Sequence, residues 1–543
     1  MPRPATNHQN PSPTLTSPAP AILVGTAQTL SLLVDQLRLV PDAPIPVGFV
    51  DVDSANGIEG LGRVAHEAHA TLAIISLPSA MTKQLDAARG AVRAAGLQER
   101  IVPPLMELLE RAPTRTDMTF VKSGREIDVT DLIGRTPYGV DRRAVASVLE
   151  GARVLITGAG GSIGSEIARI AATFRPGMLI LMERSENALF EIDRQIARKF
   201  PDVPRKALLH DIADADATMR HVLELKPDVV FHAAAHKHVP LMEDHPAHAL
   251  TNNLFGTKSV ADAALACGAK RFVLISSDKA VNPTSVMGAT KRLAEMYTQG
   301  LHKQGRAVRG SAATNFSMVR FGNVLGSACS VLPIWSTQLA EGGPITVTDP
   351  RMTRYFMTIH EAAMLVIQSA AIEPGPDAAV FVLDMGDPVR IMDLAMRFVR
   401  AHGYAPVVKG IAGTNSDVFE LQMAAARINP PPTPSLGEGA PDEGMPRMEV
   451  AVTGKRPGEK LYEELCYGSE QLRATPFPGI NSWAGELRSD FNLPAMIAEL
   501  GAARQMMEKD AVVRAIRKHV VEMRAVGEEI EARPPHMSLE RAA

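Results

Sequence analysis

The sequence predicts an α/β protein built from two parallel-sheet domains of Rossmann-like type. Short apolar runs alternate with stretches of helical periodicity, as expected for buried parallel strands separated by helices. This alternation occurs twice, on either side of a polar stretch at 111–131. The second series opens with a glycine-rich loop between a strand and a helix. A chain of 543 residues, 45% of them hydrophobic, has ample material for both domains at roughly 100–200 residues each.

Charge and cysteine content exclude several classes of protein. Lys and Arg number 57 against 60 Asp and Glu, and a net charge of −3 gives no footprint for nucleic acid or anionic membrane. Cys267, Cys329 and Cys466 lie far apart without CxxC spacing, which argues against disulfides and structural zinc. No apolar window is long enough to form a transmembrane segment, and no signal peptide is evident. We therefore expect a cytoplasmic protein.

The first domain is predicted over residues 21–110. It follows a leader, 1–20, whose six prolines predict disorder. The apolar runs AILVG, PVGFVDV and ATLAIISL are its predicted strands. Only Gly25 follows the first run, so we expect no phosphate-binding loop. A structural or regulatory role is favoured over a working nucleotide site, and a linker is expected at 111–131.

The second domain is predicted over residues 132–487. Its strands are expected at RVLITG, MLILME, DVVFHAA, RFVLISS and MVRFGNV. Prolines and glycines at 410–447 predict an inserted surface loop. Residues 488–543 carry apolar side chains at helical spacing, which predicts a helical appendage docked against this domain.

A dinucleotide site is predicted where RVLITG meets the following helix. Gly158, Gly161 and Gly164 form a GxxGxxG loop, and a helix N-terminus at this place favours a pyrophosphate. Glu183 closes the next strand, about 20 residues on, where a carboxylate accepts hydrogen bonds from ribose hydroxyls. A glycine-rich structural turn is the alternative. The first helical residues beside the pyrophosphate are Ser162 and Ile163.

The choice between NAD and NADP depends on two neighbouring residues. Glu183 favours NAD because a carboxylate repels a 2′-phosphate, whereas Arg184 could pair with that phosphate and leaves NADP open. Residues after two further strands are expected to contact the adenine or leave room for the nicotinamide ribose: Asp211, Ile212, Ala233 and Ala234.

The histidine-rich stretch FHAAAHKHVPLMEDHPAH raises the possibility of zinc. His232 closes a strand, so it does not share a helix face with His236, and no glutamate follows it as HExxH requires. We therefore expect no metal. Lys237 and His238 are instead expected to face a substrate, with a surface position as the alternative for the histidines.

Proton chemistry is predicted at the end of RFVLIS, where Ser277, Asp278 and Lys279 follow the strand. Adjacent Asp and Lys side chains can act as proton donor and acceptor. Met287 and Lys291 share a helix face four positions apart. Tyrosine at 287 would complete the YxxxK pair of short-chain dehydrogenases, but methionine cannot exchange protons. Met287 is therefore expected to pack in the core, and Lys291 is either solvated or catalytic.

These motifs resemble those of bacterial polysaccharide-biosynthesis nucleotide-sugar dehydratases, which are extended short-chain dehydrogenases. The resemblance covers roughly Ile127 to Trp483. It implies an extended short-chain dehydrogenase fold with a C-terminal substrate-binding part, and conversion of UDP-N-acetylglucosamine to a 4-keto-6-deoxy sugar. One subgroup has methionine at the tyrosine position, as at Met287. The motifs, in order, are GAGGSIGSE, HAAAHKHVPLME, NNLFGTKSVADAA, SSDKAVNPTSVMGATKRLAE, RFGNVLGS, DPRMTRYFMTIHEA and TGKRPGEKLYEEL.

The resemblance also implies roles for individual residues. Asp278 would protonate the departing C6 hydroxyl and Lys279 would act as the base at C5. Lys291 would hold the nicotinamide ribose, and Ser277 would lie near the C4 hydroxyl. The residues implied to hold the UDP-sugar are Asn253, Asn323, Arg354, Arg456 and Glu459. Surface salt bridges are the alternative for the two arginines.

The resemblance further implies a tightly held NAD or NADP that is reduced and reoxidised in each cycle, and a homo-oligomer. Longer members of this family carry transmembrane helices before the first domain, whereas this sequence begins with a polar leader. Two other functions are possible. A UDP-sugar 4-epimerase would need a tyrosine-like proton carrier and no Asp–Lys pair. A non-catalytic nucleotide-binding scaffold would tolerate loss of Asp278, Lys279 and Lys291, all of which are present.

Overall fold

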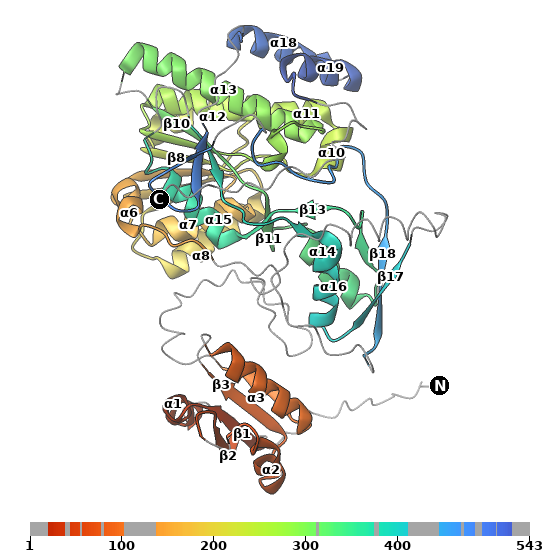
Figure 1. Ribbon diagram of the computed structural model, residues 1–543. Helices are drawn as coiled ribbons and strands as arrows, with labels where there is room; N and C mark the ends of the chain where they lie inside the picture. Colours follow the sequence, from red (N-terminus) through yellow and green to blue (C-terminus); the bar gives the residue numbers. More distant parts are fainter. Residues whose placement is uncertain are drawn as a thin grey trace, which may run out of the picture. The chain divides into compact units, whose positions relative to one another are not determined.

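The computed structural model of the chain shows two compact units, Met1–Gly124 and Arg125–Ala543 (Figure 1). The residues that the structure describes are 20–38, 44–54, 57–77, 81–102, 137–310, 314–373, 379–410, 445–467, 472–483, 491–506 and 508–523.

The first unit contains a parallel four-stranded sheet of order β2-β1-β3-β4. Helix α1 packs on one face, and α2 and α3 pack on the other. Each apolar run predicted as a strand lies within or overlaps one. The elements are β1 (Pro20–Gly25), α1 (Ala27–Arg38), β2 (Ile45–Asp51), α2 (Leu61–Glu67), β3 (Leu72–Ser76), α3 (Thr82–Ala94) and β4 (Gln98–Ile101).

The turn after β1 is filled by protein atoms. The Thr29 hydroxyl donates a 2.7 Å hydrogen bond to the main-chain oxygen of Ser76. A Cβ added at Gly25 would lie 2.5 Å from that hydroxyl oxygen and 2.6 Å from the Ser76 oxygen. Gly25 therefore allows the strand ends and α1 to pack closely.

The second unit is built on a nine-stranded sheet of order β19-β20-β15-β10-β9-β8-β5-β6-β7. The strands from β7 to β15 are parallel, and β20 and β19 add an antiparallel edge. The predicted α/β fold class is confirmed. The strands are β5 (Arg153–Thr157), β6 (Met178–Glu183), β7 (Arg205–Leu209), β8 (Val229–His232), β9 (Arg271–Ile275), β10 (Asn315–Arg320), β15 (Val380–Leu383), β19 (Arg473–Ala474) and β20 (Ile480–Trp483).

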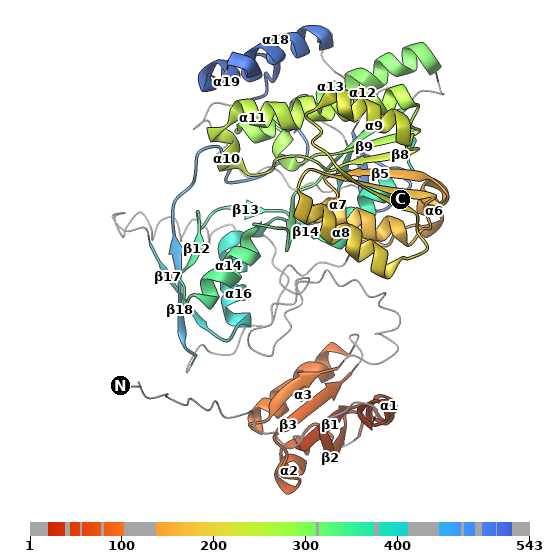
Figure 2. The same cartoon turned by 180° about the vertical axis from the view of Figure 1, so that it is seen from behind.

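Helices cover both faces of this sheet because its strands are apolar on both sides. Along β5, Val154 and Ile156 face one core and Leu155 faces the other. The first core contains α6 (Arg142–Leu149), α7 (Ser162–Ala172), α8 (Glu186–Lys199) and α15 (Ile359–Ser369). The second contains α9 (Ala215–Leu225), α10 (Val239–Asp244), α11 (Pro246–Leu250), α12 (Gly256–Cys267) and α13 (Val286–Arg309), seen from behind in Figure 2.

Two short helical segments interrupt this pattern beside the strand ends. A π-helical turn, Thr251–Phe255, joins α11 to α12. A 3₁₀ turn, Asp278–Ala280, follows β9. Both carry residues that the sequence predicts to be functional.

A smaller layer is formed by segments inserted after β10. Its three-stranded sheet has the order β12-β18-β17, and two two-stranded sheets pair β11 with β14 and β13 with β16. The elements are β11 (Asn323–Leu325), α14 (Val331–Ala340), β12 (Ile345–Val347), β13 (Thr353–Arg354), β14 (Phe356–Thr358), β16 (Val389–Arg390), α16 (Ile391–Ala401), β17 (Ala405–Lys409) and β18 (Arg447–Val452).

The C-terminal helices α18 (Leu493–Met506) and α19 (Lys509–His519) pack against the second unit. Leu500 and Ile516 are fully buried in the same core as α13. Both helices therefore contribute to that core. None of the helices within the described ranges combines the length and apolar composition that a membrane span requires.

The other predicted boundaries stay predictions. Residues 1–19 of the leader and 411–444 of the predicted inserted loop lie outside the described residues, as does the predicted linker. The described part of the first unit begins with β1 at Pro20.

Candidate functional site: a dinucleotide pocket and a buried Asp–Lys pair

The glycine-rich loop runs from the end of β5 into α7. Gly158 has a φ of +66°, and a Cβ there would lie 2.8 Å from the main-chain nitrogen of Ala234. A Cβ at Gly164 would lie 2.1 Å from the Gly158 oxygen. Gly161 is the N-cap residue of α7. The loop therefore leaves no room for side chains at these points, and its main chain is exposed to an approaching anion.

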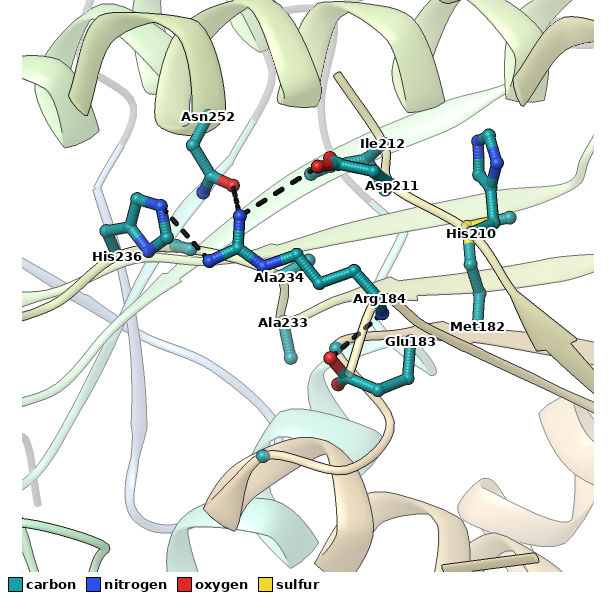
Figure 3. Close-up of a pocket in the computed structure, with 13 residues that line it drawn as sticks. Met182, Glu183, Arg184, His210, Asp211, Ile212, Ala233, Ala234, His236 and Asn252 are labelled. Carbon is teal, nitrogen blue, oxygen red and sulfur yellow. Dashed lines mark hydrogen bonds and ion pairs between the residues drawn. The ribbon is translucent and has the colours of Figure 1, made fainter. Parts of the chain in front are cut away.

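A pocket of about 180 Å³ adjoins this loop (Figure 3). It lies at the carboxyl ends of β5, β6 and β8, where open parallel sheets bind nucleotides. The pocket brings together residues predicted from four separate parts of the sequence. Its lining residues are Gly158, Gly161, Met182, Glu183, Arg184, His210, Asp211, Ile212, Ala233, Ala234, Ala235, His236 and Asn252.

Glu183 accepts three hydrogen bonds from main-chain N–H groups. The donors are Gly160 at 3.1 Å, Arg184 at 2.9 Å and Ser185 at 3.0 Å. The Glu183 carboxylate therefore also ties the glycine-rich loop to the end of β6. One of its two oxygens already serves two of these donors, which limits how many ribose hydroxyls it can bind.

Arg184 extends across the same pocket, as Figure 3 shows. Its guanidinium lies 3.5 Å from Asn252 Oδ1, 3.4 Å from His236 Nε2 and 3.9 Å from Asp211 Oδ2. These contacts are long, and the side chain is 43% exposed. A guanidinium in this place can meet an anionic group of a bound nucleotide.

The structure does not gather the histidines around a metal. His232 is buried, with ring nitrogens 2.7 Å from the Thr157 hydroxyl and 3.0 Å from the Thr257 hydroxyl. Burial and the charge of Lys291 lower the pKa of His232 to about 3, so this ring is neutral. Within the described part of the chain, no group of three potential metal ligands is found.

Two predicted substrate ligands have their polar groups engaged within the protein. The Asn253 amide oxygen accepts from the His236 N–H at 2.8 Å, and its nitrogen donates to the Thr290 hydroxyl at 3.1 Å. Asn253 is also 1% exposed. Lys237 Nζ donates to the Ala328 oxygen at 2.8 Å. In this arrangement Asn253 joins the π-helical turn to α13, and Lys237 holds the loop after β11. His238 begins α10, and burial lowers its pKa.

The loop after β11 also contacts the glycine-rich loop. Ala328 N–H donates a 3.1 Å hydrogen bond to the Ser162 hydroxyl, at the first turn of α7. The neighbouring Ile163 is half-buried against the core beneath. Sequence reasoning did not identify Ala328, because its contact is made by the main-chain N–H and does not depend on the type of side chain.

Ser277, Asp278 and Lys279 lie together at the end of β9. The Ser277 hydroxyl donates to Asp278 Oδ1 at 2.7 Å, and Lys279 Nζ lies 3.0 Å from the same oxygen. Asp278 is fully buried. Its other oxygen, Oδ2, has no hydrogen-bond partner among the described residues. Next to it, Gly322 presents no side chain, and a Cβ there would lie 3.3 Å from Oδ2. This oxygen is the one available to a ligand or a proton.

Lys279 has two further acceptors that its sequence neighbours do not provide. Its Nζ lies 3.1 Å from Asn323 Oδ1 and 3.5 Å from Glu463 Oε1. Burial lowers the pKa of Lys279, but the carboxylates of Asp278 and Glu463 outweigh burial and raise it above the usual value. Asn323 therefore contacts the Asp278–Lys279 pair through Lys279. Sequence reasoning missed Glu463, and the only signal was the pair of adjacent acidic residues, Glu463 and Glu464, in KLYEEL.

Met287 and Lys291 begin the long helix α13. Met287 is 2% exposed and packs in the core, as expected from its side chain. Lys291 Nζ donates to the Ile275 oxygen at the end of β9. Burial lowers the pKa of Lys291 to about 8, and Glu295 partly opposes that shift. A Cβ at Gly288 would lie 2.2 Å from the Lys279 oxygen, so glycine there lets α13 touch the Asp–Lys turn.

The two predicted UDP-binding arginines differ in their surroundings. Arg354 is 7% exposed and donates to the main-chain oxygens of Lys460 at 2.8 Å and Leu461 at 3.2 Å. In this structure the Arg354 guanidinium therefore holds the segment that carries Glu463, and its two terminal nitrogens are engaged by main-chain oxygens and not directed to a diphosphate. Arg456 is exposed, with its Nε 3.9 Å from Glu459 Oε1.

The fold and the site define an extended short-chain dehydrogenase: a doubly wound sheet, a glycine-rich loop at its strand ends, and a lysine on the helix after the catalytic strand. The chain belongs to the polysaccharide biosynthesis protein family, which matches residues 154–484. Within the dehydrogenase superfamily it is a CapD-like member.

Three relatives illustrate this membership. The probable polysaccharide biosynthesis protein EpsC of Bacillus subtilis (strain 168) is 39% identical over 85% of this chain and 70% of its own length. The capsular polysaccharide biosynthesis protein CapD of Staphylococcus aureus is 38% identical over 73% of this chain and 58% of its own. A UDP-N-acetylglucosamine 4,6-dehydratase (inverting) of Campylobacter jejuni subsp. jejuni serotype O:2 (strain ATCC 700819 / NCTC 11168) is 33% identical over 40% of this chain and 62% of its own. The chain thus spans only part of each relative.

Proposed function

We propose that this protein is a nucleotide-sugar 4,6-dehydratase that uses bound NAD or NADP and acts on UDP-N-acetylglucosamine or a close relative. The observation that carries the proposal is the pair of the buried Asp278 and the partly exposed Lys279 at the sheet edge, with Ser277 and Asn323 beside it. The similarity to the Campylobacter dehydratase supports the reaction and the substrate. The similarity to EpsC and CapD supports a role in making surface polysaccharide.

The residues around the pocket suit a dinucleotide. Gly158 and Gly164 bring main chain close to main chain at the N-terminus of α7, and Ala233 and Ala234 keep the end of β8 free of large side chains. Glu183, Arg184, Asp211 and Ile212 would surround the adenosine part. Lys291, held at the end of β9, would bind the nicotinamide ribose. When bound there, the dinucleotide would supply reversible hydride chemistry between sugar C4 and C6, so that no external redox partner is needed.

The Asp–Lys pair can supply the acid and the base of the elimination. Lys279 would enter the elimination as the free amine, with Asp278 as the carboxylic acid 3.0 Å away at Oδ1. The Lys279 amine would take the C5 proton while the C6–O bond breaks, and Asp278 would protonate the departing oxygen to give water. Lys279 would then return its proton to C5 as the hydride reaches C6.

Ser277 gives a route for the remaining proton. Its hydroxyl already donates to Asp278 Oδ1. Oxidation of the C4 hydroxyl precedes the elimination, so Ser277 can accept the released proton and pass its own to the Asp278 carboxylate, which makes Asp278 the acid of the next step. Met287 cannot take this part, and its burial in the core gives no support to an epimerase that needs a tyrosine-like proton carrier at this position.

The test is direct product analysis. Purified full-length protein is incubated with UDP-N-acetylglucosamine and followed by NMR. Dehydration replaces the C6 methylene signals by a methyl doublet and removes the C4 carbinol proton. Appearance of UDP-N-acetylgalactosamine with an intact C6 hydroxymethyl group would establish epimerase chemistry instead. An unchanged substrate spectrum, in protein shown to hold dinucleotide, would reject this substrate.

A further inference from the structure

Glu463 is a buried carboxylate far from the catalytic pair in sequence and next to it in space. Its side chain is 3% exposed and lies 3.5 Å from Lys279 Nζ and 3.7 Å from Arg354 Nε. Arg354 also binds the main-chain oxygens of residues 460 and 461, so it fixes the segment that carries Glu463. Glu463 is therefore held toward Lys279 by neighbouring structure.

The Lys279 ammonium has three hydrogens and three acceptors. They are Asp278 Oδ1, Asn323 Oδ1 and Glu463 Oε1, at 3.0, 3.1 and 3.5 Å. Two of these acceptors are carboxylates, although a single carboxylate would neutralise the charge of the lysine. Arg354 neutralises the charge of the second carboxylate, so the net charge of Lys279, Arg354 and the two carboxylates is zero. The pKa of Glu463 is lowered, because Lys279 and Arg354 outweigh the effect of its burial.

We propose that Glu463 is a positioning residue of the elimination, which serves as a second counter-ion of Lys279, holds that side chain in place and stabilises the ammonium formed when Lys279 takes the C5 proton. Its importance for catalysis rests on the proposed function, whereas the ion pair itself can be tested without substrate.

The physical need for a second counter-ion follows from the changing charge of Asp278. When Asp278 carries a proton, the half-buried Lys279 would favour its uncharged form if no other carboxylate lay nearby. Glu463 opposes that loss. Glu463 therefore makes the Lys279 amine a stronger base, because it stabilises the ammonium that forms when Lys279 takes the C5 proton.

The charged and polar groups that face Lys279 are Asp278 on its own turn, Asn323 on β11, Arg354 on β13 and Glu463. Glu464 offers a matched control one residue away. Its carboxylate accepts from the Asn282 amide at 3.2 Å and lies 3.4 Å from Lys460 Nζ.

The first experiment measures the titration of Lys279 directly. Full-length protein labelled with ¹³C at the lysine ε-carbons is titrated by NMR, and the Lys279 signal is identified by its loss in Lys279→Met. In Glu463→Gln the pKa of Lys279 should fall by about one to three units, the usual effect of losing an opposite charge at this range. In Glu464→Gln it should stay unchanged. An equal pKa in wild type and Glu463→Gln would overturn the proposal.

A second variant tests the same point without altering Glu463. In Asp278→Asn, Lys279 should still be charged at neutral pH, because Glu463 is its remaining counter-ion. Loss of the Lys279 proton below neutral pH in this variant would contradict the proposal, even if Glu463→Gln does not fold.

The third readout is the pH dependence of turnover. In Glu463→Gln the limb of the kcat profile governed by Lys279 should move to lower pH, whereas KM should change little. A uniform loss of kcat with an unmoved limb would mean that Glu463 only supports the structure, and would reject a positioning role. If the wild type makes no dehydrated sugar, the proposed function fails while the titration still decides the ion pair.

Discussion

Lys291 Nζ donates a 2.5 Å hydrogen bond to the main-chain oxygen of Ile275, the last residue of β9. The first turn of α13 is thereby fixed to the strand that carries the Asp–Lys pair. Asn253, in the π-helical turn before α12, also holds α13 near this point, because its amide donates to the hydroxyl of Thr290, one residue before Lys291. The lysine proposed to hold the nicotinamide ribose is therefore placed by main-chain contacts of the protein itself.

Replacing Lys291 should weaken dinucleotide binding. Lys291→Met removes one charged donor, and a hydrogen bond to a charged group contributes about 1.5–3 kcal/mol, so affinity should fall about ten- to a hundredfold. Isothermal titration of protein stripped of cofactor gives the affinity. Lys258→Met is the control, because Lys258 forms a partly exposed pair with Asp262 on α12. Equal affinities in wild type and Lys291→Met would show that Lys291 does not contact the dinucleotide.

Removing either member of the Asp–Lys pair should abolish most turnover. Asp278→Asn and Lys279→Met should each lose about a hundredfold or more, the usual contribution of a general acid or base. Met287→Leu should lose far less, because a buried apolar side chain only shapes the surroundings. Turnover is measured from the formation of the keto sugar. Near-normal rates in both polar variants would reject the proposed roles of Asp278 and Lys279.

Isotopic labels test the course of the reaction. With substrate deuterated at C4, the label should appear at C6 of the product, since the bound dinucleotide returns the same hydride. In deuterated water, solvent deuterium should enter at C5 when Lys279 delivers its proton. A C4 label returned to C4 with inverted configuration would indicate an epimerase.

The affinity for NADP should depend on Arg184. Its guanidinium lies in the pocket and makes only long contacts with Asn252, His236 and Asp211. Arg184→Ala should therefore weaken NADP binding about tenfold or more and change NAD binding little, because only NADP carries a 2′-phosphate. Competitive binding of the two dinucleotides to stripped protein measures the ratio. An equal loss of affinity for NAD and NADP would mean that Arg184 contacts a group that both dinucleotides carry.

The sheet and the dinucleotide loop were predictable because their signals are local. Each strand of β5 to β10 that lines the site is preceded or followed by helical periodicity, and both faces are apolar. Parallel strands end at one edge of a sheet. Residues that follow different strands, such as Glu183, Asp211 and Ala233, were therefore expected to meet at one pocket, as they do.

The partners of individual side chains were not predictable in this way. Glu463 reaches Lys279 through a segment distant in sequence, and its position depends on Arg354 binding that segment's main chain. Arg354 and Asn253 were expected to contact substrate, but the direction of a side chain follows from tertiary packing. Neither periodicity nor motif spacing predicts the hydrogen-bond partners of a buried guanidinium or amide group.

The last prediction concerns a buried ion pair beneath the catalytic strand ends. Arg320 and Glu295 are fully buried and joined by two hydrogen bonds of 2.8 and 2.7 Å. Burial raises the pKa of Glu295, but Arg320 and other donors outweigh it and lower that pKa from 4.5 to about 2. Glu295→Gln leaves Arg320 buried without its counter-ion, so the free energy of unfolding should fall by about 3–5 kcal/mol at neutral pH.

The pH dependence has a definite sign. A carboxyl whose pKa is lowered by folding stabilises the native state above its unfolded pKa, and this contribution is lost as pH falls toward the folded value. The stability difference between wild type and Glu295→Gln should thus be constant above about pH 4.5 and narrow as the pH falls toward 2. Urea unfolding at several pH values measures it. Glu191→Gln, which removes an exposed pair with Arg194, should change the free energy of unfolding little at any of these pH values. A difference that does not narrow in acid would mean that the variant acts through packing and not through the charge of Glu295.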